Sequence, residues 1–240
     1  MSCLVLLKIV SDQNKILHII PAAGKATRFG GIPKFLLPIS KDNFLIKYHV
    51  NEILFKDYDV KKVVAVSKEN YQTLKRLDLN AELICVDTLT MNETVVEIIN
   101  EYSDYENYIF TMPDTYFKDS NIVNEMCKKF FLEKNVCITG LFKIQEYQKG
   151  KLGQCNIDDE FITELIDKKL DCDFENAWGL IMWNKEINKL ISKKDESIGF
   201  IINKAIEEKY SISYVLGEGN YYDCGTFEEY KKLLTSIDIK

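Results

Sequence analysis

The strongest constraint on the fold is the regular alternation of short apolar runs with helix-period stretches through the first half of the chain. Short apolar runs between polar or glycine-rich segments are typical of buried strands, whereas apolar residues three and four positions apart are typical of helices. This alternation predicts a mostly parallel sheet with helices on both faces. The expected strands are 16–21, 63–66, 82–86, 108–112 and 136–142, and the expected helices are 44–55, 69–77, 93–102 and 121–134.

The second half has a different order of expected elements, with paired strands first and helices later. No internal repeat or proline-rich linker separates the halves, so we expect one α/β domain with a Rossmann-like, mostly parallel (mixed) sheet flanked by helices. Ligands of such sheets bind beyond the carboxyl ends of the strands, where the strand order reverses. The expected elements are paired strands at 153–157 and 161–166, an apolar run at 177–183, helices at 184–191 and 198–208, a strand at 212–216 and a last helix from Phe227.

Composition excludes several classes of protein. The chain has 240 residues, of which 46% are hydrophobic and 28% charged, as in an ordinary globular protein. Its 31 basic and 37 acidic residues give a net charge of −6, which disfavours nucleic acid as a partner. No apolar stretch approaches the roughly 18 residues that a membrane span needs, so no membrane partner is expected.

The cysteines and the N-terminus indicate a cytoplasmic protein. The seven cysteines are an odd number, lie singly and include no CxxC pair, so we expect reduced thiols rather than disulfides or a zinc site. The apolar opening lacks a basic start and an Ala-x-Ala exit, which disfavours a secretory signal. We expect residues 1–15 to be an extension before a domain of residues 16–240. His18 and His49 lie in apolar surroundings and are expected to pack in the core.

The segment 18–34 carries the clearest functional signal. A buried strand leads directly into a loop of small residues with three glycines and the cations Lys25, Arg28 and Lys34. Small residues let the backbone approach a ligand and let successive N–H groups bind an anion. Arginine suits a two-pronged phosphate contact, and lysine acts as a point charge. The spacing fits neither a Walker loop nor the dinucleotide-binding GxGxxG pattern, and a solvated basic loop remains the alternative.

This loop resembles the signature A-G-x-G-T-R…P-K of the nucleotidyltransferases that join a nucleoside triphosphate to a sugar 1-phosphate, in particular the uridylyl- and thymidylyltransferases. Residues 23–28 and 33–34 fill the pattern, except that Ala26 replaces its second glycine. The resemblance implies their fold, a nucleotide-diphospho-sugar transferase domain. It implies that Arg28 grips the leaving pyrophosphate and that Lys34 contacts the α-phosphate, both as catalytic residues. The nucleotide-binding residues that it implies here are Ala22, Ala23, Gly24, Lys25, Thr27 and Arg28.

Two aspartates are candidate metal ligands. Asp114 follows the apolar strand 108–112, where it could hold a metal or cap a helix. Asp223 could equally be a turn residue before a helix capped by Thr226. Nucleotidyl transfer needs a divalent cation, and both positions match the family. The resemblance therefore implies that Asp114 and Asp223 bind Mg²⁺.

The middle of the chain resembles the sugar-binding part of the family. Asp167 and Lys168 replace its Glu-Lys pair, which grips a sugar hydroxyl and the sugar phosphate, although a solvated charge run is an equal reading. Gly153 and Gly179 would be points of close approach to the sugar. The division implied is a nucleotide-binding part of about 16–143 and a sugar-binding part of about 144–225. In the segment 88–94, which lacks the family's glycine, Asn92 could cap the next helix or touch the ribose, and the choice of base stays open.

The favoured function is thus Mg²⁺-assisted in-line attack of a sugar 1-phosphate on the α-phosphorus of a nucleoside triphosphate, releasing pyrophosphate. One alternative is a cytidylyltransferase for a non-sugar phosphate, such as choline phosphate or methylerythritol phosphate. Another is a non-catalytic regulatory subunit that binds nucleotide sugars. Assembly into a homo-oligomer is left open by the sequence.

Overall fold

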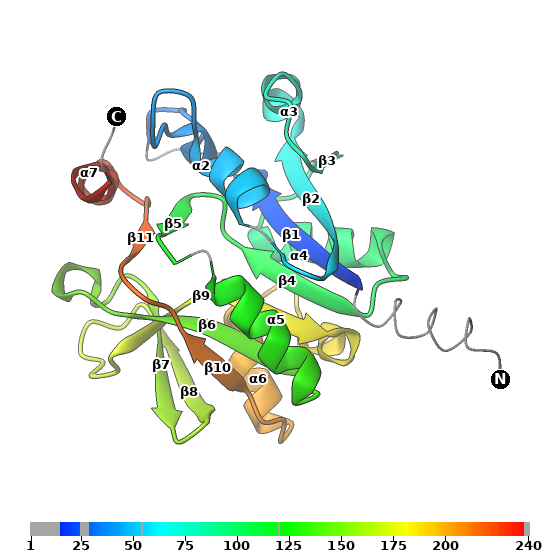
Figure 1. The fold of residues 1–240 in the computed structure, drawn as a ribbon, viewed down its shortest axis with the longest axis vertical. Coiled ribbons are helices and arrows are strands. Elements are labelled where there is room, and N and C mark those ends of the chain that lie inside the picture. Colours follow the sequence, from blue (N-terminus) through cyan, green and yellow to red (C-terminus); the bar gives the residue numbers. More distant parts are fainter. Residues whose placement is uncertain (1–14, 25–28, 54, 120, 238–240) are drawn as a thin grey trace.

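The computed structural model describes residues 15–24, 29–53, 55–119 and 121–237. Their strands form one large mixed sheet and a separate two-stranded ribbon (Figure 1). The strands are β1 (Lys15–Ala22), β2 (Asp59–Ser67), β3 (Glu82–Val86), β4 (Asn107–Thr111), β5 (Thr115–Phe117), β6 (Cys137–Lys143), β7 (Gly153–Asp158), β8 (Phe161–Asp167), β9 (Asn176–Asn184), β10 (Ser213–Leu216) and β11 (Tyr221–Asp223).

In the described part of the chain the large sheet has nine strands, in the order β3-β2-β1-β4-β9-β6-β10-β8-β7. β1 pairs in parallel with β2 on one side and with β4 on the other, so the strand order reverses at β1. β9 lies antiparallel between β4 and β6. The predicted α/β fold with a mixed sheet is confirmed, but parallel pairing dominates only the β3-β2-β1-β4 half. The alternation pattern did not predict this because the apolar run 177–183, which becomes β9, carries no sign of its direction.

Helices cover both faces of the sheet. The α-helices are α2 (Leu45–Lys47), α3 (Lys68–Lys75), α4 (Met91–Glu101), α5 (Ile122–Leu132), α6 (Phe200–Glu207) and α7 (Phe227–Ser236). Shorter helical turns are η2 (Lys34–Leu36), η3 (Tyr48–Glu52), η4 (Glu146–Gln148) and η5 (Lys185–Leu190).

Two predicted helices are built differently from the expectation. The helix expected at 44–55 is one α-helical turn followed by the π-helical turn η3, in which the N–H of Ile53 donates to the carbonyl of Tyr48 at 3.1 Å. The helix expected at 184–191 is the 3₁₀ segment η5. Apolar spacing alone does not distinguish these tighter or wider turns from an α-helix.

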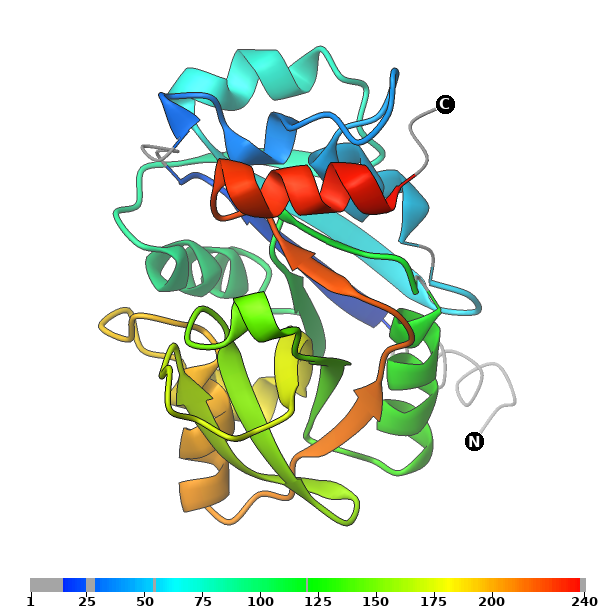
Figure 2. The same cartoon turned by 90° about the vertical axis from the view of Figure 1, so that its left-hand side faces the viewer.

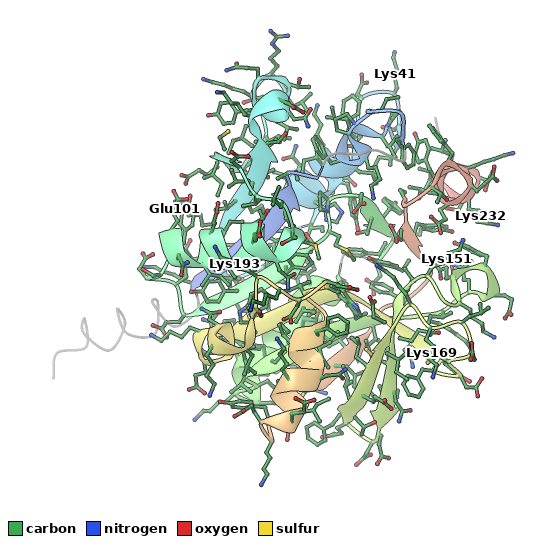
Figure 3. The ribbon with its side chains drawn as sticks, turned by 180° about the vertical axis from the view of Figure 1, so that it is seen from behind. Lys41, Glu101, Lys151, Lys169, Lys193 and Lys232 are labelled. Carbon is green, nitrogen blue, oxygen red and sulfur yellow. The ribbon has the colours of Figure 1, made fainter. Side chains whose placement is uncertain are left out.

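Successive residues of β1 point alternately to the two faces of the sheet, each of which is covered by helices. Leu17 and Ile19 pack with Val95 of α4, and α6 packs in the same cluster; Figure 3 shows both helices from behind. Ile20 points the other way and packs with Ile46 of α2 and with Val50. A buried strand between two helical layers explains why 16–21 is an uninterrupted apolar run.

β5 and β11 form an antiparallel ribbon outside the large sheet, with Tyr221 opposite Phe117 and Asp223 opposite Thr115. In Figure 1 the two strands lie side by side, and Figure 2 shows α7 following directly from β11. Neither strand was predicted from the sequence. The ribbon brings residues from the middle and the end of the chain together.

Both histidines are fully buried, as predicted. His18 bonds through Nε2 with Thr111 Oγ1 at 2.8 Å, and His49 bonds through Nε2 with the Thr115 carbonyl at 2.8 Å. The described cysteines all have free thiols. Among the described residues, no helix has the length and apolarity that crossing a membrane requires.

Acidification is expected to destabilise the protein through these histidines. Burial lowers the pKa of His18 and lowers that of His49 to about 4, whereas an unfolded histidine titrates near 6.5. Between these values the unfolded chain binds more protons, so the free energy of unfolding falls as pH falls. His49 alone should account for about 2 kcal/mol between pH 7 and pH 5. Urea titrations at both pH values measure this, and His49→Gln should lose correspondingly less than the parent; an equal loss in both would contradict the assignment.

Candidate active site

A cavity of about 250 Å³ opens at the carboxyl edge of the sheet, where the strand order reverses. Its walls come from the end of β1, the loop from β3 to α4, and the turn after β4. This is the position at which open α/β sheets bind ligands. The lining residues are Pro21, Ala22, Ala23, Gly24, Lys34, Phe35, Thr88, Leu89, Thr90, Met91, Thr94, Met112, Pro113 and Asp114.

The structure describes the two ends of the predicted phosphate loop. Ala22, Ala23 and Gly24 line the cavity, whereas Lys25, Thr27 and Arg28 lie outside the described residues. Gly30 and Gly31 both have left-handed backbone, with φ of 59° and 89°, which a side chain would strain. They turn the chain so that Lys34 begins η2 at the wall of the cavity.

Lys34 and Asp114 form an ion pair although they are 80 positions apart in the chain. Asp114 lies in the turn between β4 and β5, and its backbone carbonyl accepts the N–H of Cys224 at 3.0 Å. That contact and the β5–β11 pairing bring Asp223 to the same place. The structure thus gathers three of the predicted residues.

The electrostatics of Asp223 show how close these groups are. Burial is the main cause that raises the pKa of Asp223 to about 7, and the charge of Asp114 raises it further. Lys34 and Lys168 act in the opposite direction. Two carboxylates that repel each other in a partly buried place are stabilised by a cation between them.

The donor set fits a hard divalent cation. Among the described residues no three His, Cys, Asp or Glu side chains gather into a complete metal cage. Two carboxylates are nevertheless what Mg²⁺ commonly takes from a protein, because it keeps several waters and binds substrate phosphates as well. Asp114 and Asp223 therefore suit a cation that leaves coordination positions open for the phosphates of a triphosphate.

Asp167 and Lys168 lie at the end of β8, with Asp167 opposite Gly153 of β7. Their side chains are 3.9 Å apart, and burial raises the pKa of Asp167. The side chain of Lys168 is 65% exposed, and its charge lowers the pKa of Asp223. The predicted acceptor pair thus faces the same edge as the two aspartates.

Lys168 has an unusual backbone for a lysine, with φ of 50°. Left-handed backbone costs a residue with a side chain about 1–2 kcal/mol, and such strain collects at functional sites. Lys168→Gly should relieve the strain and raise the free energy of unfolding by up to about 1 kcal/mol, while lowering activity about 100-fold through loss of the ammonium.

Lys209→Gly is the matched control, because Lys209 also has positive φ, 65°, but follows the C-cap of α6 and does not line the cavity. It should gain similar stability and keep full activity. Thermal unfolding and initial rates on the two variants check both effects. A Lys168→Gly protein with normal activity would contradict a role in binding the acceptor.

Gly153 and Gly179 are tightly packed by side chains of this chain. A Cβ at Gly153 would lie 2.3 Å from Nε1 of Trp178. A Cβ at Gly179 would lie 2.8 Å from the rings of Phe142 and Tyr221. The core itself thus requires glycine at both positions, so approach to a sugar is not needed to explain them.

Asn92 does not line the cavity. It is fully buried in the first turn of α4, and its amide donates to the carbonyl of Ser192 at 3.1 Å. Capping by Asn92, one of its two expected roles, is wrong, because Thr90 caps α4 in a reciprocal box with Glu93. The sequence signal for this was the spacing T-x-x-E. The neighbours Thr88, Thr90 and Met91 form the cavity wall instead.

Sequence reasoning also missed Lys151 and the role of Glu229. Glu229 is only 7% exposed, and its carboxylate accepts Lys151 Nζ at 3.0 Å and the Thr226 hydroxyl at 2.9 Å. Lys151, labelled in Figure 3, comes from the segment between η4 and β7. Thr226 caps α7, as predicted. No spacing rule links residues 78 positions apart, so only the structure reveals this ion pair.

A cavity at the strand-order reversal, with Lys34 and Asp114 in its lining, is the arrangement in which α/β enzymes bind their ligands. The chain belongs to the family of MobA-like NTP transferase domains, whose model matches residues 18–141. It is a nucleotidyltransferase, as the loop signature implied. No protein of curated function matches the sequence significantly.

Solved structures with a similar fold cover nearly the whole chain. A putative glucose-1-phosphate thymidylyltransferase from Bacillus anthracis has a TM-score of 0.78 and 17% identity, covering 94% of this chain and 96% of its own. A UDP-glucose pyrophosphorylase in complex with UDP-glucose has a TM-score of 0.70 and 18% identity, over 92% and 97%. An inositol-1-phosphate CTP transferase from T. maritima has a TM-score of 0.70 and 18% identity, over 95% and 98%. These likenesses confirm the single-domain fold.

Proposed function

We propose that this protein joins a nucleoside triphosphate to a sugar 1-phosphate, giving a nucleoside diphosphate sugar and pyrophosphate. The observation that carries the proposal is the meeting of Lys34, Asp114 and Asp223 at the edge of the cavity, with Lys168 close to Asp223. Residues of about 16–143 would hold the nucleotide, and residues of about 144–225 would hold the acceptor.

The reaction is a single displacement at the α-phosphorus. An oxygen of the sugar phosphate forms the new P–O bond, and the bond to the β-phosphate oxygen breaks, so the electron pair leaves with pyrophosphate. Lys34 offsets the charge that grows on the α-phosphate, and Arg28, which lies outside the described residues, would hold the leaving pyrophosphate. Lys168 would hold the phosphate of the acceptor in line. No nucleophile of the protein takes part.

Asp114 and Asp223 are the residues that would hold Mg²⁺. When bound, a divalent cation neutralises phosphate oxygens and so lowers the charge repulsion between the two reacting phosphates. Asp167 would accept a hydrogen bond from a hydroxyl of the acceptor, since among the described residues its half-buried carboxylate is paired with Lys168 at 3.9 Å, beyond hydrogen-bond distance.

The test is pyrophosphate release with Mg²⁺ in a panel that crosses four nucleoside triphosphates with sugar 1-phosphates, inositol 1-phosphate, choline phosphate and methylerythritol phosphate. Release that requires one triphosphate and one sugar 1-phosphate is expected. Release with inositol, choline or methylerythritol phosphate alone would replace the sugar acceptor by a non-sugar one. Nucleotide binding without release from any acceptor would contradict the proposed reaction.

A further inference from the structure

The ribbon of β5 and β11 carries both candidate metal ligands. Asp114 directly precedes β5, and Asp223 ends β11. In the described part of the chain this ribbon is a sheet of its own, so strand pairing fixes β5 to β11 but not to the large sheet. Other contacts must therefore determine where the two carboxylates lie relative to the cavity.

The turn η3 supplies such contacts along the outer edge of β5. The imidazole of His49 bonds through Nε2 to the Thr115 carbonyl at 2.8 Å, and the hydroxyl of Tyr48 donates to the Phe117 carbonyl. Thr115 and Phe117 are alternate residues of β5, so their carbonyls point to the same side of the strand. The N–H donors of a neighbouring strand would bond to these same two carbonyls. Two side chains of η3 thus take the place of a third strand.

The chemistry of His49 fits this task. A carbonyl oxygen only accepts, so Nε2 must carry the proton. The ring is wholly buried, and burial lowers its pKa to about 4, which keeps it neutral at physiological pH. The Nε2–H of this buried ring thus bonds to Thr115, the residue next to Asp114.

Hydrogen bonds connect η3 to the large sheet. Lys62 of β2 donates through Nζ to the carbonyl of Val50 and, at 2.8 Å, to that of Ile53. These are carbonyls at the end of η3, where a helical turn leaves such groups without partners of its own. A continuous set of contacts thus runs from β2 through η3 to β5.

We infer that His49 and Tyr48 are positioning residues, which hold the ribbon so that Asp114 and Asp223 together fit one divalent cation. The inference rests on the metal pair of the proposed function. Mg²⁺ and similar ions demand a near-ideal arrangement of oxygen ligands, so a small displacement of one carboxylate weakens binding. Neither residue lines the cavity.

The test uses Mn²⁺ alone as the probe and follows the EPR signal of free Mn²⁺ on titration with the full-length protein. His49→Leu, which fills the space without a donor, should raise the Kd for Mn²⁺ at least about tenfold. His49→Gln places an amide N–H at the same distance along the side chain and should restore the Kd to within about twofold of the parent.

Tyr48→Phe and Tyr108→Phe form a matched pair, because each removes one hydroxyl that donates to a backbone carbonyl. Tyr108 bonds to Tyr105, away from the ribbon, so Tyr108→Phe should leave the Kd unchanged, whereas Tyr48→Phe should raise it. If the His49→Leu protein does not fold, this pair of variants still tests the positioning role. Equal Kd values in the pair, or a His49→Gln protein as weak as His49→Leu, would overturn the inference.

Asp223→Asn separates the inference from the proposed function. If Asp223→Asn loses Mn²⁺ binding while His49→Leu and Tyr48→Phe keep it, the metal pair stands and the positioning role is overturned. If Asp223→Asn binds Mn²⁺ as the parent does, the metal pair itself is wrong, and the inference is overturned with it.

Discussion

Lys34→Met is expected to lower the kcat of nucleotidyl transfer by about 10²–10³-fold, the range found when one preorganised donor to a developing charge is removed. Lys34 is the described cation that lines the cavity and pairs with Asp114, so its ammonium lies beside the proposed metal pair and the cavity in which the triphosphate would bind. Methionine keeps the length of the side chain and removes the charge. Initial rates at saturating substrates and Mg²⁺ measure the effect.

Lys41→Met is the control. Lys41 follows η2 in the chain, is exposed, and points into solvent at the edge of the molecule (Figure 3). It should keep the parent kcat. A Lys34→Met protein with more than about a third of the parent kcat would show that Lys34 serves only to balance the charge of Asp114, since loss of the ammonium should cost far more.

Asp114→Asn is expected to lower kcat by about 10³-fold, because it removes a ligand charge from the proposed metal pair. It also has an effect that requires neither metal nor substrate. The charge of Asp114 contributes to the raised pKa of Asp223, about 7, so in the metal-free protein Asp114→Asn should lower that pKa. Lys34→Met should raise it, because Lys34 favours the ionised form of Asp223.

Carboxyl ¹³C NMR titration of Asp223 measures these opposite shifts in two variants that are both expected to be inactive. Asp78→Asn serves as control, because Asp78 is exposed in the segment between α3 and β3 and lies outside the cavity lining. It should leave both kcat and the pKa of Asp223 unchanged. Shifts in the same direction for Asp114→Asn and Lys34→Met would contradict the arrangement of the three groups.

Much of the fold could be predicted because burial on both faces makes the central strands continuously apolar. The run at 16–21 became β1, and 82–86 became β3 without change. The ribbon could not be predicted in this way, since β5 and β11 are three residues each and show no periodicity. Their pairing depends on the Cys224–Asp114 backbone contact, which no local pattern encodes.

The candidate site was predictable where a loop or motif marks it, as at Lys34, Asp114 and Asp223. Contacts that depend on tertiary structure were not predictable. Asn92 was a reasonable candidate by residue type, but the turn of α4 points its amide at Ser192 rather than into the cavity. His49 looked like a packed core residue, and only the structure shows that its proton is donated beside Asp114.

Direct attack of the sugar phosphate on the α-phosphorus is tested most directly by exchange of labelled pyrophosphate into the nucleoside triphosphate. With Mg²⁺, label should enter the triphosphate only when the nucleoside diphosphate sugar is present, because the nucleotide is never held covalently by the protein. Exchange with the triphosphate alone would require a nucleotidyl-enzyme intermediate and would contradict the single displacement proposed for this site.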